Sequence, residues 1–181
     1  MAGFSLMAGL LLASGSPPDT LEQFEATLEA YPTATQALET WCHARFHSTE
    51  PVRATVVSAT SDRPTARIRT TLRLGPDDQL GYRRVKLSCG GRELSLAYNW
   101  YAPGRLTPEM NRLLAETDTP FGRVAGPLRF TREPLDNAWG EADYCPPQTI
   151  LTRRALLRLP GGTPLAMVVE CYTRENLAPA P

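Results

Sequence analysis

The chain has 181 residues, of which 42% are hydrophobic and 21% are charged. This length and composition are typical of one globular domain with its own core and argue against extensive disorder. The 19 acidic residues balance the 19 basic ones, so the chain lacks the charge excess typical of a nucleic-acid-binding surface. Lys86 is the only lysine. Because guanidinium groups bind carboxylates in bidentate geometry, a few of the arginines are candidate ligand anchors.

The first fifteen residues form an uncharged apolar run that ends in Ala13-Ser14-Gly15, small residues typical of a signal-peptide cleavage site. The run is shorter than the roughly 20 residues that span a bilayer, so it does not predict a stable membrane anchor. We expect residues 1–15 to be a signal peptide and residues 16–181 to be a single domain, periplasmic or secreted. No Lys or Arg precedes the run, and the alternative is a misassigned start or an apolar arm on a cytoplasmic protein.

The chain has four cysteines: Cys42, Cys89, Cys145 and Cys171. No CxxC motif occurs, and there are only two histidines, so the sequence predicts no metal site. In an oxidising compartment the cysteines could form two disulfides in any of three pairings. Buried free thiols are the alternative.

Hydrophobic periodicity predicts a mixture of helices and strands. Residues 20–30 and 33–46 are predicted helices, with Thr20 and Thr33 or Thr35 as caps, and a third helix begins at Thr107-Pro108. Residues 54–57, 66–72 and 128–132 are β-like, and 137–147 is a predicted loop. Residues 80–89 and 92–101 form a predicted hairpin around Gly90-Gly91, and residues 151–159 and 163–173 form another around Gly161-Gly162. The expected class is α+β, a single antiparallel sheet with helices packed on it.

A two-residue turn fixes the register that we expect in each hairpin. In the first hairpin it predicts Val85 opposite Leu96, with Arg84 opposite Ala97 and therefore a diagonal neighbour of Asn99. In the second hairpin it predicts Arg153 opposite Glu170.

Glu170 is the most informative acidic residue, because a carboxylate in an otherwise apolar strand needs a partner or has a raised pKa. It is either a ligand-facing group or half of an ion pair with Arg153. Arg84 and Asn99 form a predicted polar pair suited to a carboxylate, although a solvated sheet face is the alternative. No phosphate-binding loop, nucleophile elbow or Ser-His-Asp set occurs in the sequence, and we expect no cofactor.

Seven segments, in order and spacing, resemble chorismate lyase: Gly81–Leu94, Ala97–Pro103, Leu106–Glu109, Thr119–Arg123, Arg153–Leu159, Gly162–Leu165 and Val169–Tyr172. The resemblance covers roughly the last hundred residues and is loose before them. It implies one antiparallel sheet with helical flaps over a buried aromatic-acid site, a fold shared with effector-binding domains of some bacterial repressors. A single domain leaves no room for a DNA-binding domain, so we do not expect a repressor.

The resemblance also implies site residues. Arg84 would hold the ring carboxylate of the ligand, and Glu170 would contact its ether oxygen. Phe121 would direct its backbone amide at the carboxylate, beside Gly122, and Ala34 would supply a looser backbone contact. The family has a second arginine where this chain has Asn99, and Arg105 is the candidate to replace that lost contact.

Two main functions follow from these residues. The first is a carbon–oxygen lyase that eliminates pyruvate from chorismate to give 4-hydroxybenzoate, the reaction that feeds ubiquinone biosynthesis. The second is an exported, non-catalytic binding protein for a small aromatic carboxylate, favoured by Asn99 and the predicted leader. A secreted structural domain is the remaining alternative. We expect a monomer with a small-molecule partner and no nucleic-acid partner.

Overall fold

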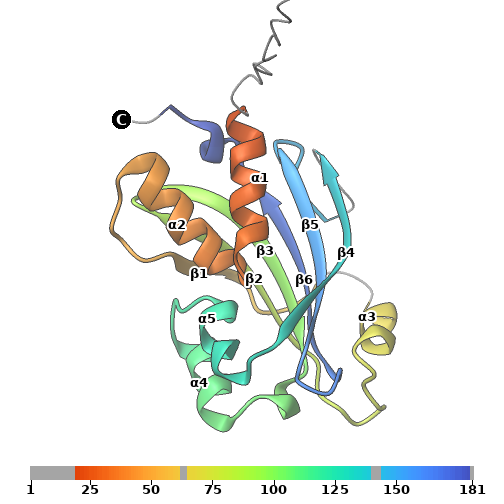
Figure 1. Ribbon diagram of the computed structural model, residues 1–181. Helices are drawn as coiled ribbons and strands as arrows, with labels where there is room; N and C mark the ends of the chain where they lie inside the picture. Colours follow the sequence, from red (N-terminus) through yellow and green to blue (C-terminus); the bar gives the residue numbers. More distant parts are fainter. Residues whose placement is uncertain (1–18, 62–64, 140–143, 180–181) are drawn as a thin grey trace, which may run out of the picture.

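The computed structural model describes residues 19–61, 65–139 and 144–179, so the predicted signal peptide lies outside the described residues. The chain forms one six-stranded sheet with strand order β1-β2-β3-β6-β5-β4, in which all neighbours are antiparallel (Figure 1). The α+β prediction with a single antiparallel sheet is confirmed. No helix in the described part of the chain is long and apolar enough to cross a membrane.

The strands are β1 (Arg53–Ser58), β2 (Gly81–Cys89), β3 (Arg92–Tyr101), β4 (Thr131–Trp139), β5 (Leu151–Arg158) and β6 (Pro164–Tyr172). The α-helices are α1 (Thr20–Ala30), α2 (Ala34–Phe46), α3 (Ala66–Thr71), α4 (Pro108–Glu116) and α5 (Phe121–Ala125). Short 3-10 turns are η1 (Pro103–Arg105), η2 (Gly126–Leu128) and η3 (Arg174–Leu177).

Side-chain caps define where the longer helices begin. Asp19, rather than Thr20, caps α1 in a capping box with Glu22. Thr33 caps α2 by accepting a hydrogen bond from the Gln36 amide, and Thr107 caps α4 in the same way. Each cap satisfies backbone N–H groups that the first helical turn leaves without a partner.

The two faces of the sheet carry different layers. One face packs against α1 and α2 at one end and against α4 and α5 at the other, as Figure 1 shows. The opposite face carries α3 and a cluster of aromatic side chains that includes Tyr82, Tyr98 and Trp100. Because successive strand residues point to opposite faces, the register decides which polar side chains reach the helix-covered face.

The first hairpin departs from its predicted register by one residue. Strand β2 has an irregularity between Leu87 and Ser88, and beyond it Val85 lies opposite Ala97, not Leu96. Arg83 therefore lies opposite Asn99, and Arg84 lies opposite Tyr98. The extra residue is Leu94 of β3, so each β3 residue beyond it shares a face with the β2 residue next to the one expected from the turn. The prediction that Arg84 and Asn99 share a face was wrong.

The second hairpin has the predicted register, with Arg153 opposite Glu170 and Leu157 opposite Ala166. Elsewhere, residues 66–71 form helix α3 instead of the predicted strand. The predicted strand 128–132 and loop 137–147 were also misplaced, because η2 occupies 126–128 and β4 continues to Trp139.

Two disulfides join distant parts of the chain. Cys42 of α2 bonds to Cys89 at the end of β2, and Cys145 bonds to Cys171 of β6. All four cysteines are thus paired, and none is a free thiol.

Candidate functional site

A small inner chamber lies between the helix-covered face of the sheet and the starts of α2 and α5. It has a volume of about 40 Å³, space for roughly three water molecules. Its floor consists of apolar side chains from β2, β3, β5 and β6, together with Asn99 and Glu170. The starts of α2 and α5 form its walls, and Phe130 and Arg132 complete it. We call this space the inner chamber.

The structure brings together most of the site residues expected from the sequence. Asn99, Phe121, Gly122, Ala34 and Glu170 all line the inner chamber. A Cβ atom added at Gly122 would lie 3.2 Å from the Thr33 Cβ, so glycine lets α5 approach the start of α2 closely. This close approach brings two segments that are distant in sequence to the same wall.

Two of the expected ligand contacts do not reach the chamber. Arg84 lies on the face of the sheet opposite to Asn99, because the register slips by one residue at Leu94 of β3. Arg105 donates to the backbone carbonyls of Leu72, Arg73 and Pro164, and so fastens neighbouring loops instead of replacing the missing arginine. Neither residue lines the chamber.

Arg83 occupies the position on the helix-covered face that Arg84 was expected to hold. Only 3% of its surface is exposed. Its two terminal nitrogens donate to the carbonyls of Thr117 and Thr119, each at 3.2 Å, immediately before the Pro120-Phe121 wall of the chamber. Among the described residues no carboxylate forms an ion pair with Arg83, and its Nε atom has no hydrogen-bond partner. Burial lowers the pKa of this guanidinium, whereas Tyr101 opposes that shift.

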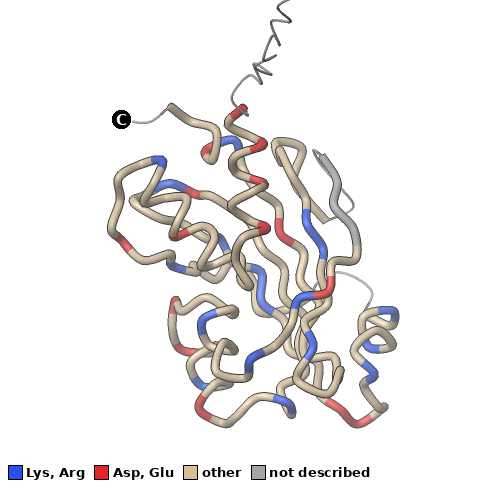
Figure 2. The backbone as a smooth tube through the Cα atoms, viewed as in Figure 1, with Lys and Arg blue, Asp and Glu red and all other residues tan. Residues whose placement is uncertain are grey.

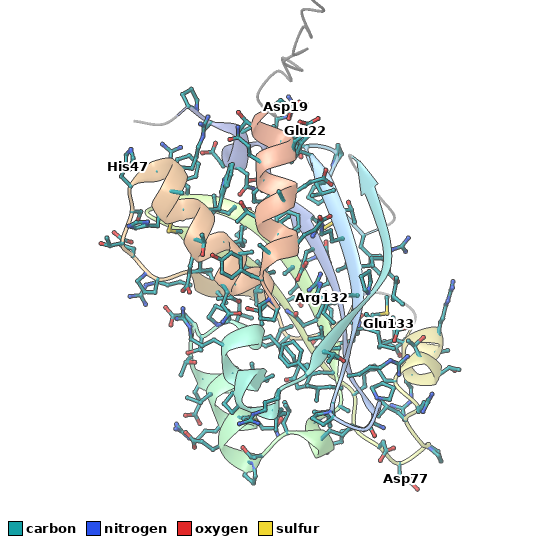
Figure 3. All side chains as sticks on the ribbon, in the orientation of Figure 1. Asp19, Glu22, His47, Asp77, Arg132 and Glu133 are labelled. Atoms are coloured by element: carbon teal, nitrogen blue, oxygen red, sulfur yellow. A yellow bond between two sulfur atoms is a disulfide. The ribbon has the colours of Figure 1, made fainter. Side chains whose placement is uncertain are left out.

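Glu170 pairs with Arg132, a residue that the sequence analysis did not select. Arg132 donates to both carboxylate oxygens, at 3.0 and 2.6 Å. The Tyr172 hydroxyl donates to the same carboxylate at 2.9 Å. Arg153, the partner predicted for Glu170, instead pairs with Glu29 of α1 at 3.2 Å. Figure 3 shows Arg132, at the start of the edge strand β4, near the middle of the view.

The arrangement of charge favours binding of a ligand more than general acid catalysis. Glu170 already accepts three hydrogen bonds, from Arg132 and Tyr172, so both of its carboxylate oxygens are engaged within the protein. In contrast, Arg83 is a buried cation whose charge is not balanced by a contacting carboxylate. No group of three or more His, Cys, Asp or Glu side chains in the described residues is suited to hold a metal ion.

Comparison with solved structures identifies the fold. The effector domain of PhnF from Mycobacterium smegmatis superposes with a TM-score of 0.56 at 11% identity, covering 78% of this chain and 88% of that domain. PhnF from the same organism gives a TM-score of 0.58 at 9% identity over 82% of this chain. This chain spans 66% of the length of that PhnF structure. The molecule therefore has the chorismate lyase-like fold found in effector domains.

The sequence places the chain in a narrower group. No family model matches it. The uncharacterized protein y4mC of Sinorhizobium fredii is 38% identical over 184 residues, covering 89% of this chain and 77% of y4mC. The chain belongs to the same protein family as y4mC.

Proposed function

We propose that the protein binds a small aromatic carboxylate in the inner chamber without converting it. The observation that carries this proposal is the buried Arg83, which has no contacting carboxylate. It does not itself line the closed chamber, but it lies opposite the chamber residue Asn99 and donates to the Thr119 carbonyl beside the Pro120-Phe121 wall. An anionic ligand would supply the missing negative charge. The apolar floor, which includes Val85, Leu157 and Val168, suits the face of an aromatic ring.

Binding requires the chamber to enlarge. Pockets that hold drug-sized molecules have volumes of roughly 300–1,000 Å³, far above the chamber's about 40 Å³. Phe130 is the wall element best placed to move, because it is partly exposed and lies in the two-residue connection between η2 and β4. The neighbouring Arg129 has a left-handed φ of 52°, a conformation that costs non-glycine residues energy.

The alternative is the chorismate lyase reaction. The presence of Glu170 in the chamber favours it, because this residue matches the glutamate that the family places at the ether oxygen. Two features weigh against retained catalysis: Asn99 stands where the family has a second arginine, and Arg132 and Tyr172 occupy the Glu170 carboxylate.

Isothermal titration of the purified protein with 4-hydroxybenzoate, alongside an assay for its formation from chorismate, tests both functions. Saturable binding without turnover is the expected result. Turnover of chorismate would establish the lyase instead. An absence of both turnover and binding would contradict both functions and leave a structural role.

The two disulfides bear on where this binding occurs. We propose that the protein acts in the periplasm or outside the cell, because disulfides persist in oxidising compartments. Mass spectrometry of the protein from its native host would then show loss of residues 1–15 and four oxidised cysteines. A full-length mass with reduced thiols would contradict this proposal.

A further inference from the structure

Two larger hollows adjoin the inner chamber. One is a groove of about 600 Å³ between the end of α1 and the strands β4 and β5. The other, of about 380 Å³, lies between the start of α2 and the segment from α5 to Phe130. Phe130 lines both hollows and the inner chamber. Phe130 is therefore part of the boundary between the chamber and both hollows, together with Arg132 toward the groove and with Thr33, Thr35 and Gly122 toward the second hollow.

Charged side chains distinguish the groove at the end of α1. Arg132 lines both this groove and the inner chamber, while Arg153 and Glu29 line the groove alone. Tyr31, an exposed aromatic residue at the end of α1, also lines it. Figure 2 shows the acidic residues along α1 in front of the strands, and α1 contains no basic residue. The groove thus combines apolar walls with a few ionic groups, as small-molecule sites do.

Arg153 is the group in this groove whose interactions are least complete. Only 7% of the residue is exposed, and its Nε atom has no hydrogen-bond partner among the described residues. The carboxylate directly across the strand pair, Glu170, is bonded to Arg132. The carboxylate that does contact Arg153 is that of Glu29, at 3.2 Å, and the Glu29 side chain is 70% exposed. Glu25 of α1 also interacts electrostatically with Arg153, and this interaction opposes the rise that burial causes in the pKa of Glu25.

These contacts make Glu29 a replaceable partner. Ion pairs that involve an exposed side chain contribute little, because water solvates the released carboxylate almost equally well. A ligand carboxylate in the groove would bond to the terminal nitrogen of Arg153 that now contacts Glu29. A turn of the guanidinium toward the groove would let the same carboxylate satisfy the buried Nε as well. Release of Glu29 in exchange for a ligand carboxylate therefore costs little.

We infer that the groove is a second compartment of the ligand site, in which Arg153 binds an anionic extension of the ligand in place of Glu29. This inference rests on the proposed function, because the aromatic part of the same ligand occupies the inner chamber. The extension passes Phe130 and Arg132, the two residues shared by the chamber and the groove. The natural ligand is then an elongated aromatic molecule with acidic groups at both ends.

Two probes of different length test this inference by isothermal titration. The short probe is 4-hydroxybenzoate, and the long probe is 4-(carboxymethoxy)benzoate, which adds a second carboxylate. We expect the long probe to bind the wild-type protein roughly tenfold more tightly, as one added charge-assisted hydrogen bond would produce. Arg153→Gln should remove this advantage and leave the affinity for the short probe unchanged.

Glu29→Gln provides an independent variant that does not disturb the core, because the Glu29 side chain is exposed. Removing the competing carboxylate should raise affinity for the long probe roughly threefold and leave the short probe unaffected. Glu22→Gln is the matched control, since it changes the same charge on the same helix and glutamine preserves the capping box.

The outcomes separate this inference from the proposed function. If the short probe binds but neither variant changes the ratio of the two affinities, the inference that the groove is a second compartment is wrong, and the proposed function stands. If neither probe binds the wild-type protein, the proposed function itself fails, and the inference fails with it. If Arg153→Gln does not fold, the ratio measured with Glu29→Gln still decides the question.

Discussion

Arg132 of β4 reaches across the whole width of β5 to form a bidentate ion pair with Glu170 of β6. The Nη2–Oε2 and Nη1–Oε1 distances are 2.6 and 3.0 Å, although β4 and β6 are not adjacent in the sheet. The side chains are 21% and 7% exposed, so both charges are largely withdrawn from water. Burial lowers the pKa of Arg132, but the Glu170 carboxylate more than offsets this effect and leaves the pKa raised. The pair thereby fastens an edge strand to the centre of the sheet.

Arg132→Met should lower the free energy of unfolding by about 3 kcal/mol, because it leaves the Glu170 carboxylate buried without its cation. Replacing both members, in Arg132→Met with Glu170→Leu, should recover most of this loss. Urea unfolding measures each value. Arg158→Met is the control, since it breaks an ion pair of the same edge strand β4, between Arg158 of β5 and the more exposed Glu133, and should change stability little. Equal losses in the two single variants would contradict the importance of the buried pair.

Arg83 and its neighbour Arg84 give opposite predictions for ligand binding. Arg83→Met should weaken binding of 4-hydroxybenzoate on the order of 30-fold, because it removes the buried cation beside the chamber. Arg84→Met should leave the affinity unchanged, because this residue lies on the opposite face of the sheet. Titration of both variants, with circular dichroism to verify folding, makes the comparison. Loss of binding in Arg84→Met alone would restore the original assignment.

The neighbouring arginines also show what the sequence could predict. The glycine pairs located both hairpins, and the two-residue turn gave the correct register for Arg153 and Glu170. The same reasoning failed by one residue at Arg84, because the irregularity between Leu87 and Ser88 lies beyond the turn itself. A bulge depends on how the finished sheet twists and packs, and residue periodicity does not reveal it. One extra residue in the strand pairing is enough to place Arg83, instead of Arg84, on the same face of the sheet as Asn99.

The Glu170 partner was missed for a different reason. The sequence correctly indicated that a carboxylate in an apolar strand needs a compensating charge, but it offered only the cross-strand Arg153. Arg132 lies 38 residues away, on a strand two positions across the sheet. Its proximity results from strand order, which local patterns do not specify. The strand predicted at 66–72 was wrong for another reason. Its arginine, isoleucine and threonine residues alternate as in a strand, but local propensity is a weak guide and these residues form α3.

Phe130→Ala should accelerate ligand association, because this side chain is the one residue that lines the inner chamber and both of the adjoining hollows described above. We expect the association rate for 4-hydroxybenzoate, measured by stopped-flow fluorescence, to rise severalfold. The dissociation rate should rise as well, because the ring no longer closes the chamber. Phe130→Leu retains bulk and is the control. An unchanged association rate in the alanine variant would show that the ligand enters by another route.

Tyr172 links stability to alkaline pH. Burial raises its pKa well above the usual value, and the nearby Glu170 carboxylate raises it further. The folded state therefore holds the phenolic proton more tightly than the unfolded state, whose tyrosine pKa is about 10. This contribution is fully present below about pH 10 and is lost as the pH rises toward the folded pKa.

Tyr172→Phe should thus be less sensitive to alkali than the wild-type protein. At pH 8 the variant should be less stable by about 1 kcal/mol, because Glu170 loses a hydrogen-bond donor. Between pH 9 and 11 the wild-type free energy of unfolding should fall more steeply, so the two curves approach each other. Urea unfolding across this range measures both curves. Parallel curves would show that Tyr172 titrates alike in the folded and unfolded states.

The two disulfides should contribute unequally to stability. Cys42 and Cys89 are 47 residues apart, and Cys145 and Cys171 are 26 apart. If the bonds act mainly by restricting the unfolded chain, loop-closure entropy gives about 4 kcal/mol for the first and about 3.5 kcal/mol for the second. Urea unfolding of the paired alanine variants Cys42→Ala with Cys89→Ala, and Cys145→Ala with Cys171→Ala, measures each contribution.

The control for these variants is the effect of dithiothreitol. Reduction should destabilise each paired variant further by the value of its remaining bond, because the two loops are closed independently. A variant that lacks all four cysteines should not respond to the reductant. If the bond with the shorter loop contributes more, restriction of the unfolded chain is not the main effect. The strength of Cys145–Cys171 would then reflect contacts in the folded state, where Cys171 follows Glu170 directly in β6.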